Sequence, residues 1–403
     1  MTVEEIDQHL SYLRKKYRFK SFFRKAKRLV VDFVPLPGIR PTHVFFRKTV
    51  RESTASVTIT PKTFAVPCRR ISLQLSPVTV YGLQNVYLTP DSTYFLSTDL
   101  QSLYYDDVEQ FSADYTLLYN SKNLLFHGHR LAKINNLPKE KRLQEAVFMG
   151  GTFSFNYFHF LIEILPKFQF LDEIPMQKGA VFITPQVIRQ NPNLNELLSF
   201  FIAERKVEYL DPEKYYHFSK LWHITYPNSM VPNIGEGEHY RAEFTKFSRK
   251  SVSYVRSICL KGYKITEVSI IPVTKIFLAR RSQFRKYNET ELLDIAAAYG
   301  FQAVYLEDLN IHEQIFLMQH AEYVIGPSGA AWTNIIFAQP GKTKGLVWLG
   351  NVWKDFSAFS TLADFVDFDM YHYRFDYNDA TFHSDYELPT SEFKDHLIKL
   401  LNT

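Results

Sequence analysis

Apolar and polar residues in the second half of the chain alternate in blocks that predict strands and helices in turn. Short apolar runs at residues 275–280, 303–307, 323–326 and 345–349 indicate strands, and the segments at residues 289–299, 312–320 and 330–337 between them have a helical period. Strands separated by about 10 to 15 helical residues predict a parallel, doubly wound sheet. Ligands of such sheets bind beyond the carboxyl ends of the strands.

The first half of the chain shows the same alternation less regularly. Residues 78–100 indicate short strands broken by turns, and strands at 146–151 and 179–185 are each followed by a helix, at 156–165 and 193–203. A polar stretch with prolines and glycines at 227–237 marks a domain boundary, before a helix at 239–260. We therefore predict an arm (1–33), two domains (34–237 and 238–380), and a C-terminal segment (381–403) whose helix at 391–401 packs back toward the first domain.

The sequence YVIGPSGAAWTNIIF at residues 323–337 predicts an anion site. An apolar strand ends at Gly326, Gly329 lets the backbone turn tightly, and a helix begins at Ala330. The first amide groups of a helix have no internal partners, and the positive end of the helix dipole lies beside them. Phosphate is the usual ligand of this arrangement.

Basic residues follow the first strand of this second block, namely Arg280, Arg281, Arg285 and Lys286. Because the carboxyl ends of parallel strands face the same crevice, Arg280 and Arg285 can hold a diphosphate from one side while the glycine turn holds it from the other. The plainer interpretation is that these arginines are solvent-facing loop residues.

A polar stripe interrupts the otherwise apolar helix predicted from residue 156. Asn156, His159 and Glu163 fall on one face, with His159 and Glu163 adjacent at positions i and i+4. A carboxylate beside an imidazole orients it and favours its charged form, which suits a general base that accepts a proton from a hydroxyl. The alternative is that the two side chains only satisfy each other's hydrogen bonds in the buried wall between the domains. Pro166 is expected to end or kink the helix.

The net charge of +5 is concentrated near the N-terminus, because residues 1–33 hold nine Lys and Arg against four Asp and Glu, which leaves 38 of each for the rest. The basic residues are interleaved with Leu, Tyr and Phe, a pattern that suits an anionic membrane surface. The alternative is a basic helix packed on its own domain, and we expect no nucleic-acid partner.

The remaining composition favours a soluble two-domain protein. No apolar run approaches the roughly 20 residues needed to span a bilayer, and the N-terminus lacks a secretory signal pattern. Cys68 and Cys259 are too far apart in the sequence to suggest a disulfide framework. We therefore expect a cytoplasmic protein, peripheral at the inner face of the plasma membrane.

Two motifs resemble those of glycosyltransferase family 61. The family's C-terminal pattern is matched by Ala279-Arg280, Arg285, Asn288-Glu289, Glu313-Gln314 and GPSGAAWTN. Its N-terminal pattern is matched by FNYFHFLIEILPKF, through Asn156, Tyr157, His159, Glu163 and Pro166. The resemblance extends over about residues 145–350. Ser328 stands where the family commonly has histidine, and a hydroxyl cannot carry charge or act as a base near neutral pH.

The resemblance implies a GT-B-like α/β fold, with two Rossmann-like domains whose parallel sheets face an interdomain cleft. It implies an inverting, metal-independent transferase that uses a nucleotide sugar, UDP-linked, and a glycan or lipid-linked glycan acceptor in capsule or lipopolysaccharide synthesis. The implied catalytic residues are Glu163 and His159, and the sequence leaves open which is the base. The remaining predicted site residues are, on the donor side, Arg280, Arg285, Ser328, Gly329, Ala330, Thr333, Asn334 and Glu307, and, on the acceptor side, Asn156 and Tyr157.

Several of these residues have plainer interpretations. Glu307 either binds the ribose or is a surface carboxylate, and Thr333 and Asn334 either contact the donor or cap and pack their helix. Asp367 and Asp369 spell the D-x-D of metal-dependent sugar transferases, but two carboxylates alone are weak evidence for a metal site.

Two functions of other classes compete. Gly326 to Ala330 reads G-x-S-x-A, close to the nucleophile elbow of α/β-hydrolases, with Asp367, Asp369, His372 and His383 downstream in the expected order. A non-catalytic module that binds a nucleotide sugar or a glycan is the other alternative.

Overall fold

The computed structural model describes residues 3–18, 27–106, 123–142, 144–230, 240–281, 285–350, 353–376 and 384–403. The chain divides into two compact units, which we describe separately. Unit 1 holds residues 1–54, 76–227 and 231–238, and unit 2 holds residues 55–75, 228–230 and 239–403. The last exchange between the units along the chain comes at residues 238–239, next to the predicted boundary at 237–238, which stays a prediction. The polar stretch at 231–237 that marked this boundary lies outside the described residues.

Unit 1 contains two sheets. Their orders are β11-β15-β6-β7-β8-β1-β10-β9 and β14-β13-β12-β16-β5-β2. The strands are β1 (Arg28–Pro35), β2 (Val44–Arg51), β5 (Val78–Leu83), β6 (Val86–Leu88), β7 (Tyr94–Ser97), β8 (Ser102–Tyr105), β9 (Leu124–His127), β10 (Leu131–Asn135), β11 (Lys139–Lys141), β12 (Glu145–Phe148), β13 (Val181–Pro185), β14 (Val207–Leu210), β15 (Tyr215–His217) and β16 (Lys220–Ile224).

In the six-stranded sheet, β14, β13, β12 and β16 are parallel, and β5 and β2 extend one edge through antiparallel pairings of β16 with β5 and of β5 with β2. Side chains from both sheets, including Tyr81, Phe95 and Phe148, form one hydrophobic core. The helical elements of this unit are α1 (Val3–Arg18), η2 (Leu36–Gly38), η3 (Pro41–His43), α2 (Tyr157–His159), the π-helical η4 (Phe160–Ile164), η5 (Leu165–Glu173), α3 (Gln186–Gln190) and α4 (Pro192–Ile202).

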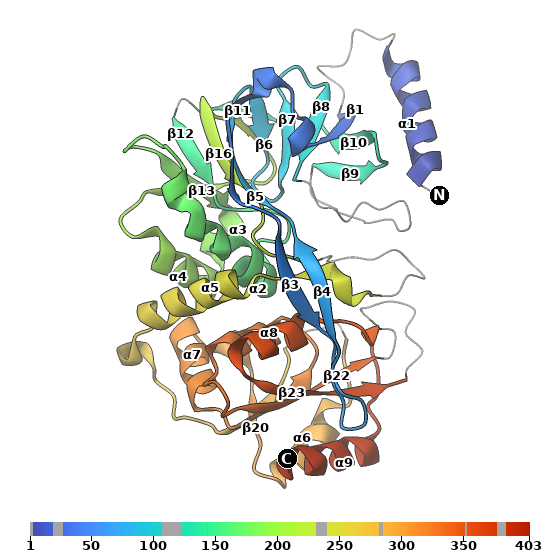
Figure 1. The fold of residues 1–403 in the computed structure, drawn as a ribbon, viewed down its shortest axis with the longest axis vertical. Helices are drawn as coiled ribbons and strands as arrows, with labels where there is room; N and C mark the ends of the chain where they lie inside the picture. Colours follow the sequence, from blue (N-terminus) through green and yellow to red (C-terminus); the bar gives the residue numbers. More distant parts are fainter. Residues whose placement is uncertain are drawn as a thin grey trace. The chain divides into compact units, whose positions relative to one another are not determined.

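Helix α1 packs on unit 1, beside β9 and β10 (Figure 1). Leu10 is fully buried, and the carboxylate of Asp7 accepts hydrogen bonds from the backbone N–H groups of His129 and Leu131, at 3.0 and 3.1 Å. Arg14 pairs with Asp32 at 2.5 Å. The first half of the predicted arm is therefore the packed helix of the second interpretation. Residues 19–26, with Lys20, Arg24 and Lys25, lie outside the described residues, and membrane binding stays a proposal.

Unit 2 is built on a five-stranded sheet of order β20-β19-β21-β22-β23, and all four of its pairings are parallel. This parallel pairing agrees with the alternation in the sequence. The strands of the unit are β3 (Thr54–Ile59), β4 (Arg70–Leu75), β17 (Ser229–Met230), β18 (Thr245–Lys246), β19 (Lys275–Leu278), β20 (Gln302–Val304), β21 (Tyr323–Pro327), β22 (Lys344–Gly350) and β23 (Asp369–Phe375). Whether the whole chain is GT-B-like stays a prediction.

The helical elements of unit 2 follow the expected order with shifted ends. They are η6 (Ala242–Phe244), α5 (Arg249–Gly262), η7 (Ile265–Glu267), α6 (Glu289–Ala297), η8 (Leu306–Asp308), α7 (Ile311–His320), η9 (Ala330–Phe337), α8 (Ala358–Val366) and α9 (Thr390–Leu401). Element η9, predicted as an α-helix, is a 3₁₀ helix. Helix α5 begins about ten residues later than the sequence suggested, at the cap Ser248, whose hydroxyl accepts from the N–H of Ser251.

Two segments pack differently from their prediction. Helix α9 lies with α6 in unit 2 (Figure 1), where Phe393, Leu397 and Leu400 share a core with the strand residues Phe277 and Trp348. The apolar stripe of α9 therefore packs inside unit 2 rather than on the N-terminal domain.

The hairpin of β3 and β4, which the sequence placed in the first domain, belongs to unit 2 because its tip is held there. Phe64 stacks on Tyr371 at 4.4 Å between ring centres.

Candidate functional site

The turn after β21 lies beside the end of β19, because these two strands are neighbours in the parallel sheet. Gly326 allows this close approach, since a Cβ atom at this position would lie 2.7 Å from the Cβ of Leu278. The backbone of Gly329 is extended, with φ 170°, so glycine is not required there for a left-handed turn. A Cβ atom at this position would overlap the guanidinium of Arg280, so any other residue would displace the end of that side chain. Gly329 therefore accommodates the close approach of the Arg280 side chain rather than the tight backbone turn that was predicted.

Arg280 holds the turn directly. Its Nη2 donates a hydrogen bond to the carbonyl oxygen of Ser328, and its backbone N–H donates to the carboxylate of Glu289 at 3.1 Å. Glu289 also accepts from the hydroxyl of Tyr287 at 2.6 Å. The strand end, the glycine turn and the start of α6 are therefore tied together, which places the guanidinium beside the turn, as the sequence predicted.

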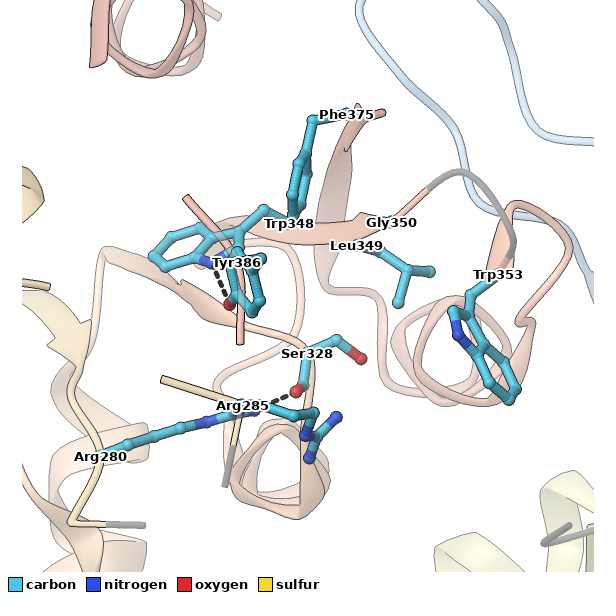
Figure 2. A pocket seen from close by; sticks show the side chains of 9 residues that line it. All are labelled: Arg280, Arg285, Ser328, Trp348, Leu349, Gly350, Trp353, Phe375 and Tyr386. Atoms are coloured by element: carbon cyan, nitrogen blue, oxygen red, sulfur yellow. Dashed lines mark hydrogen bonds between the residues drawn. The ribbon is translucent and has the colours of Figure 1, made fainter. Parts of the chain in front are cut away.

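A pocket with an empty volume of about 310 Å³ opens at this point, and Figure 2 shows the side chains that line it. Arg280 and Arg285 approach Ser328 from one side, and the indole of Trp353 lies on the other. The described lining residues are Arg280, Arg285, Ser328, Trp348, Leu349, Gly350, Trp353, Phe375 and Tyr386. They include two cations and no carboxylate, so the pocket suits an anion that also has an apolar or aromatic part.

One wall of the pocket comes from a segment that the sequence analysis did not assign to a site. The indole N–H of Trp348 donates to the hydroxyl of Tyr386 at 3.1 Å, and Tyr386 stacks on Tyr287 with ring centres 5.6 Å apart. The backbone N–H of Tyr386 donates to the carbonyl oxygen of Lys286 at 2.9 Å. Burial raises the pKa of Tyr386, and the charges of Arg280 and Arg285 act against this rise. Tyr386 is therefore a neutral, fixed aromatic wall near neutral pH.

The remaining predicted donor residues lie outside the described lining of the pocket. Thr333 and Asn334 are buried, and the side-chain amide of Asn334 donates to Gln314 at 3.2 Å. Gln314 in turn donates to the carbonyl oxygens of Leu306 and Leu309. This contact supports the interpretation that Asn334 packs η9 against α7 and the loop before it. Ala330 is the first residue of η9 and is half-buried.

Glu307 is exposed and lies in η8. It accepts a long hydrogen bond from the backbone N–H of Arg281, at 3.5 Å. The guanidinium of Arg281 pairs with Asp308 at 2.6 Å and lies over the ring of Tyr305. Of the adjacent arginines, Arg280 therefore faces the pocket and Arg281 is a surface residue.

The second group of predicted residues lies in unit 1, after β12. Asn156 caps the short helix α2, and its side-chain oxygen accepts from the N–H of Phe158 at 2.9 Å. Tyr157 is the first residue of this helix and is half-buried. After His159 the helix widens into the π-helical turn η4, which contains Glu163. Single π-helical turns occur frequently at functional sites.

His159 and Glu163 form the predicted pair. Nδ1 of His159 lies 2.7 Å from Oε2 of Glu163, and the two side chains are 7% and 8% exposed. A carboxylate on Nδ1 fixes the tautomer in which Nδ1 carries the proton and Nε2 accepts. Nε2 has no hydrogen-bond partner among the described residues. The arrangement therefore leaves a ring nitrogen for a hydroxyl group to approach.

Lys167, which the sequence analysis did not single out, is fully buried one turn after Glu163. Its Nζ donates to the carbonyl oxygen of Gly150 at 3.0 Å and lies 4.2 Å from the ring centre of Tyr226. Burial lowers the pKa of Lys167 to about 8, although the carboxylates of Asp106 and Glu163 oppose this shift. A lysine on an apolar helix face, four residues after an acid, was the available signal in the sequence.

The residues of the hydrolase alternative are not arranged as a triad within the described part of the chain. Ser328 has no left-handed backbone, unlike the strained serine of a nucleophile elbow, and none of the described histidines bonds to its hydroxyl. His372 is buried in β23, and burial lowers its pKa to about 3. Asp369 pairs with Lys62, and Asp367 ends α8 with φ 56°. His383 lies outside the described residues.

Among the described residues, no group of three or more His, Cys, Asp or Glu side chains is arranged to hold a metal ion. No helix among these residues is long and apolar enough to cross a membrane.

Both groups of site residues lie within one stretch of the sequence that matches a known family. Residues 157–345 match the sequence model of the family described as Glycosyltransferase 61. This range contains His159 and Glu163 at one end and Arg280, Arg285 and Ser328 at the other. No curated protein matches the chain.

Proposed function

Because residues 157–345 belong to glycosyltransferase family 61, we propose that this protein is an inverting glycosyltransferase that uses a UDP-sugar and needs no metal ion. Its acceptor in this proposal is a glycan or lipid-linked glycan of a bacterial surface polysaccharide, capsule or lipopolysaccharide. The proposal includes the GT-B-like fold and a cytoplasmic, peripheral location at the membrane, for which the basic residues near the N-terminus are the support.

The observation that carries the donor half of the proposal is the pocket of unit 2. Two arginines and the turn after β21 lie at the carboxyl ends of neighbouring parallel strands, where ligands of α/β sheets bind. Guanidinium groups form paired hydrogen bonds with phosphate oxygens, and the aromatic walls from Trp348 and Tyr386 suit a flat base or a sugar face. A nucleoside diphosphate has both parts.

The His159 and Glu163 pair supports the acceptor half of the proposal. In the proposed reaction, Nε2 of His159 takes the proton of an acceptor hydroxyl while Glu163 orients the ring and stabilises the imidazolium that forms. The hydroxyl oxygen bonds to the anomeric carbon, the bond from that carbon to the diphosphate breaks, and the electron pair leaves with the diphosphate. Arg280 and Arg285 stabilise this negative charge as it grows.

Two measurements test the proposal. Ligands that bind only the folded protein raise its melting temperature, so UDP and UDP-sugars should do so in a thermal-shift screen, whereas uridine should have a weaker effect. UDP release from a panel of UDP-sugars should be measurable without added metal and in the presence of a chelator. If no nucleotide raises the melting temperature, the proposal that this pocket binds the donor is wrong. If nucleotides bind but no donor and acceptor pair releases UDP, the protein is the non-catalytic binding module.

A further inference from the structure

Two phenylalanines lie on the turn that precedes His159. Phe155 is 59% exposed, which is unusual for a phenylalanine, and Phe153 is half-buried. Phe153 has a φ of 62°, in the left-handed region that large side chains seldom adopt. Such a backbone persists only where the surrounding structure holds it, and it occurs frequently at ligand sites.

The turn is held from inside by short hydrogen bonds. The Ser154 hydroxyl donates to the carbonyl oxygen of Gly151 at 2.6 Å and accepts from the N–H of Gly151 at 2.9 Å. The N–H of Asn156 donates to the carbonyl oxygen of Phe153 at 2.8 Å, and Asn156 then caps α2. The backbone that carries both rings is therefore held before any ligand binds, which reduces the entropic cost of binding.

Phe153 contacts both the exposed ring of Phe155 and the imidazole of His159. The ring centres of Phe153 and His159 are 5.1 Å apart and the rings are inclined by 30°. Phe155 lies 6.0 Å from Phe153 at 62°, in an edge-to-face arrangement. A molecule that brings a hydroxyl to Nε2 of His159 would thus have an aromatic surface beside it.

We propose that Phe153 and Phe155 form a stacking platform for the acceptor sugar of this enzyme, a pyranose that presents an apolar C–H face. The platform rests on the proposed function, because it is the approach to His159 that identifies its ligand as the acceptor. The C–H groups on one face of a pyranose carry partial positive charge, and the faces of aromatic rings carry partial negative charge. The axial or equatorial position of the sugar hydroxyls decides how much of this face is free of polar groups, so the platform selects among acceptor sugars.

A single exposed apolar side chain is common on protein surfaces and by itself indicates no site. Among the described residues, Ile271 is 81% exposed, lies in a loop of unit 2, and is not one of the described lining residues of the Arg280 pocket. It is therefore a matched control for removal of exposed apolar surface. Phe155 differs from it in being held by a built turn and in contacting the ring that stacks near His159.

The test uses saturation-transfer NMR on the full-length protein with the methyl β-glycosides of glucose, galactose and N-acetylglucosamine and with methyl α-mannoside. At least one glycoside should show transfer to the protons of its apolar face, and Phe155→Ala should reduce this transfer about threefold or more. Phe155→Trp should retain it, because tryptophan keeps a planar ring, and Ile271→Ala should leave it unchanged. With an active donor, Phe155→Ala should raise the acceptor KM by about 3- to 10-fold and change kcat by less than about twofold.

UDP binding, measured on the same samples, separates the two proposals. A saturation-transfer signal that is equal in wild type and Phe155→Ala contradicts the platform and leaves the donor site standing. The same holds if no glycoside gives a signal while UDP still binds. Absence of UDP binding in a folded wild-type protein contradicts the proposed function itself. A loss of transfer in Phe155→Leu as large as in Phe155→Ala would further show that ring stacking, rather than apolar bulk, holds the sugar.

Discussion

Oε2 of Glu163 lies 2.7 Å from Nδ1 of His159, and this contact makes the two residues unequal partners. The carboxylate uses one oxygen to orient the ring, so that Nε2 of the imidazole is the atom left to take a proton. The sequence alone placed the two side chains on one face of a helix and left the choice of base open. The geometry favours His159 as the base and Glu163 as a positioning residue.

Removal of the base should therefore cost more than removal of its orienting partner. We expect His159→Ala to lower kcat by about 10² to 10⁴, the usual contribution of a general base, and Glu163→Gln to lower it less, since glutamine retains an oxygen that accepts from Nδ1–H. Single-turnover rates with a saturating UDP-sugar measure the difference. A larger loss in Glu163→Gln than in His159→Ala would assign the base to Glu163 instead.

The two adjacent arginines offer a matched pair for the donor site. Arg280→Ala should weaken UDP binding about 10- to 100-fold, because hydrogen bonds between charged groups contribute about 1.5–3 kcal/mol each. Arg281→Ala should bind UDP as the wild type does, because this guanidinium pairs with Asp308 outside the described pocket lining. Isothermal titration calorimetry with UDP measures both variants, and equal affinities for the two would remove Arg280 from the site.

Gly329 and Arg280 should be coupled. A methyl group at position 329 collides with the guanidinium of Arg280, while the extended backbone at this residue tolerates alanine. Gly329→Ala should therefore weaken UDP binding in the wild-type background and have little further effect in Arg280→Ala. A double-mutant cycle measures the coupling, with Gly179→Ala as a control since its Cβ atom meets nothing within 4 Å. Additive losses would show that the two residues act independently.

Lys167 should give the stability of the protein a distinctive pH dependence. The pKa of Lys167 is about 8 in the folded protein and 10.5 in the unfolded chain, so between these values the unfolded chain binds the extra proton. The free energy of unfolding therefore gains a contribution of up to about 3 kcal/mol as pH rises through this window, and the unfavourable cost of burying the charge is fully present below pH 8.

Urea unfolding of wild type and Lys167→Met between pH 7 and pH 10.5 measures this contribution, because other titrating groups cancel in the difference between the two proteins. The wild type should gain stability relative to the variant as pH rises. A difference that stays constant over this range would mean that Lys167 titrates normally in the folded protein.

Experiments on Ser328 distinguish the transferase hypothesis from the hydrolase hypothesis. We expect Ser328→Ala to keep UDP-sugar turnover within about tenfold, because one neutral hydrogen bond contributes about 0.5–1.5 kcal/mol, and a fluorophosphonate probe should not label the wild-type serine. Mass spectrometry of the probe-treated protein decides the second point. Labelling of Ser328 that heat denaturation abolishes would indicate an activated nucleophile and favour the hydrolase.

Local patterns in the sequence predicted much of unit 2. The strands β19, β21 and β22 and the helices α6 and α7 lie within a few residues of their predicted bounds, because each has a clear apolar period and a polar boundary. Helix type was predicted less well. Residues 160–164 form a π-helical turn and residues 330–337 form a 3₁₀ helix, where the sequence predicted regular α-helices.

The sequence by itself determined that His159 and Glu163 share a helix face, and that Arg280 and Ser328 follow strands of one parallel sheet. Both relations follow from short-range periodicity and from the rule that parallel strands end at one edge. Only the tertiary structure decided that these two strands are neighbours, that the guanidinium of Arg280 fills the space beside Gly329, that Tyr386 forms a wall of the Arg280 pocket, and that Lys167 is fully buried. These depend on contacts between segments distant in the chain, and no local pattern specifies which distant side chain fills a given space.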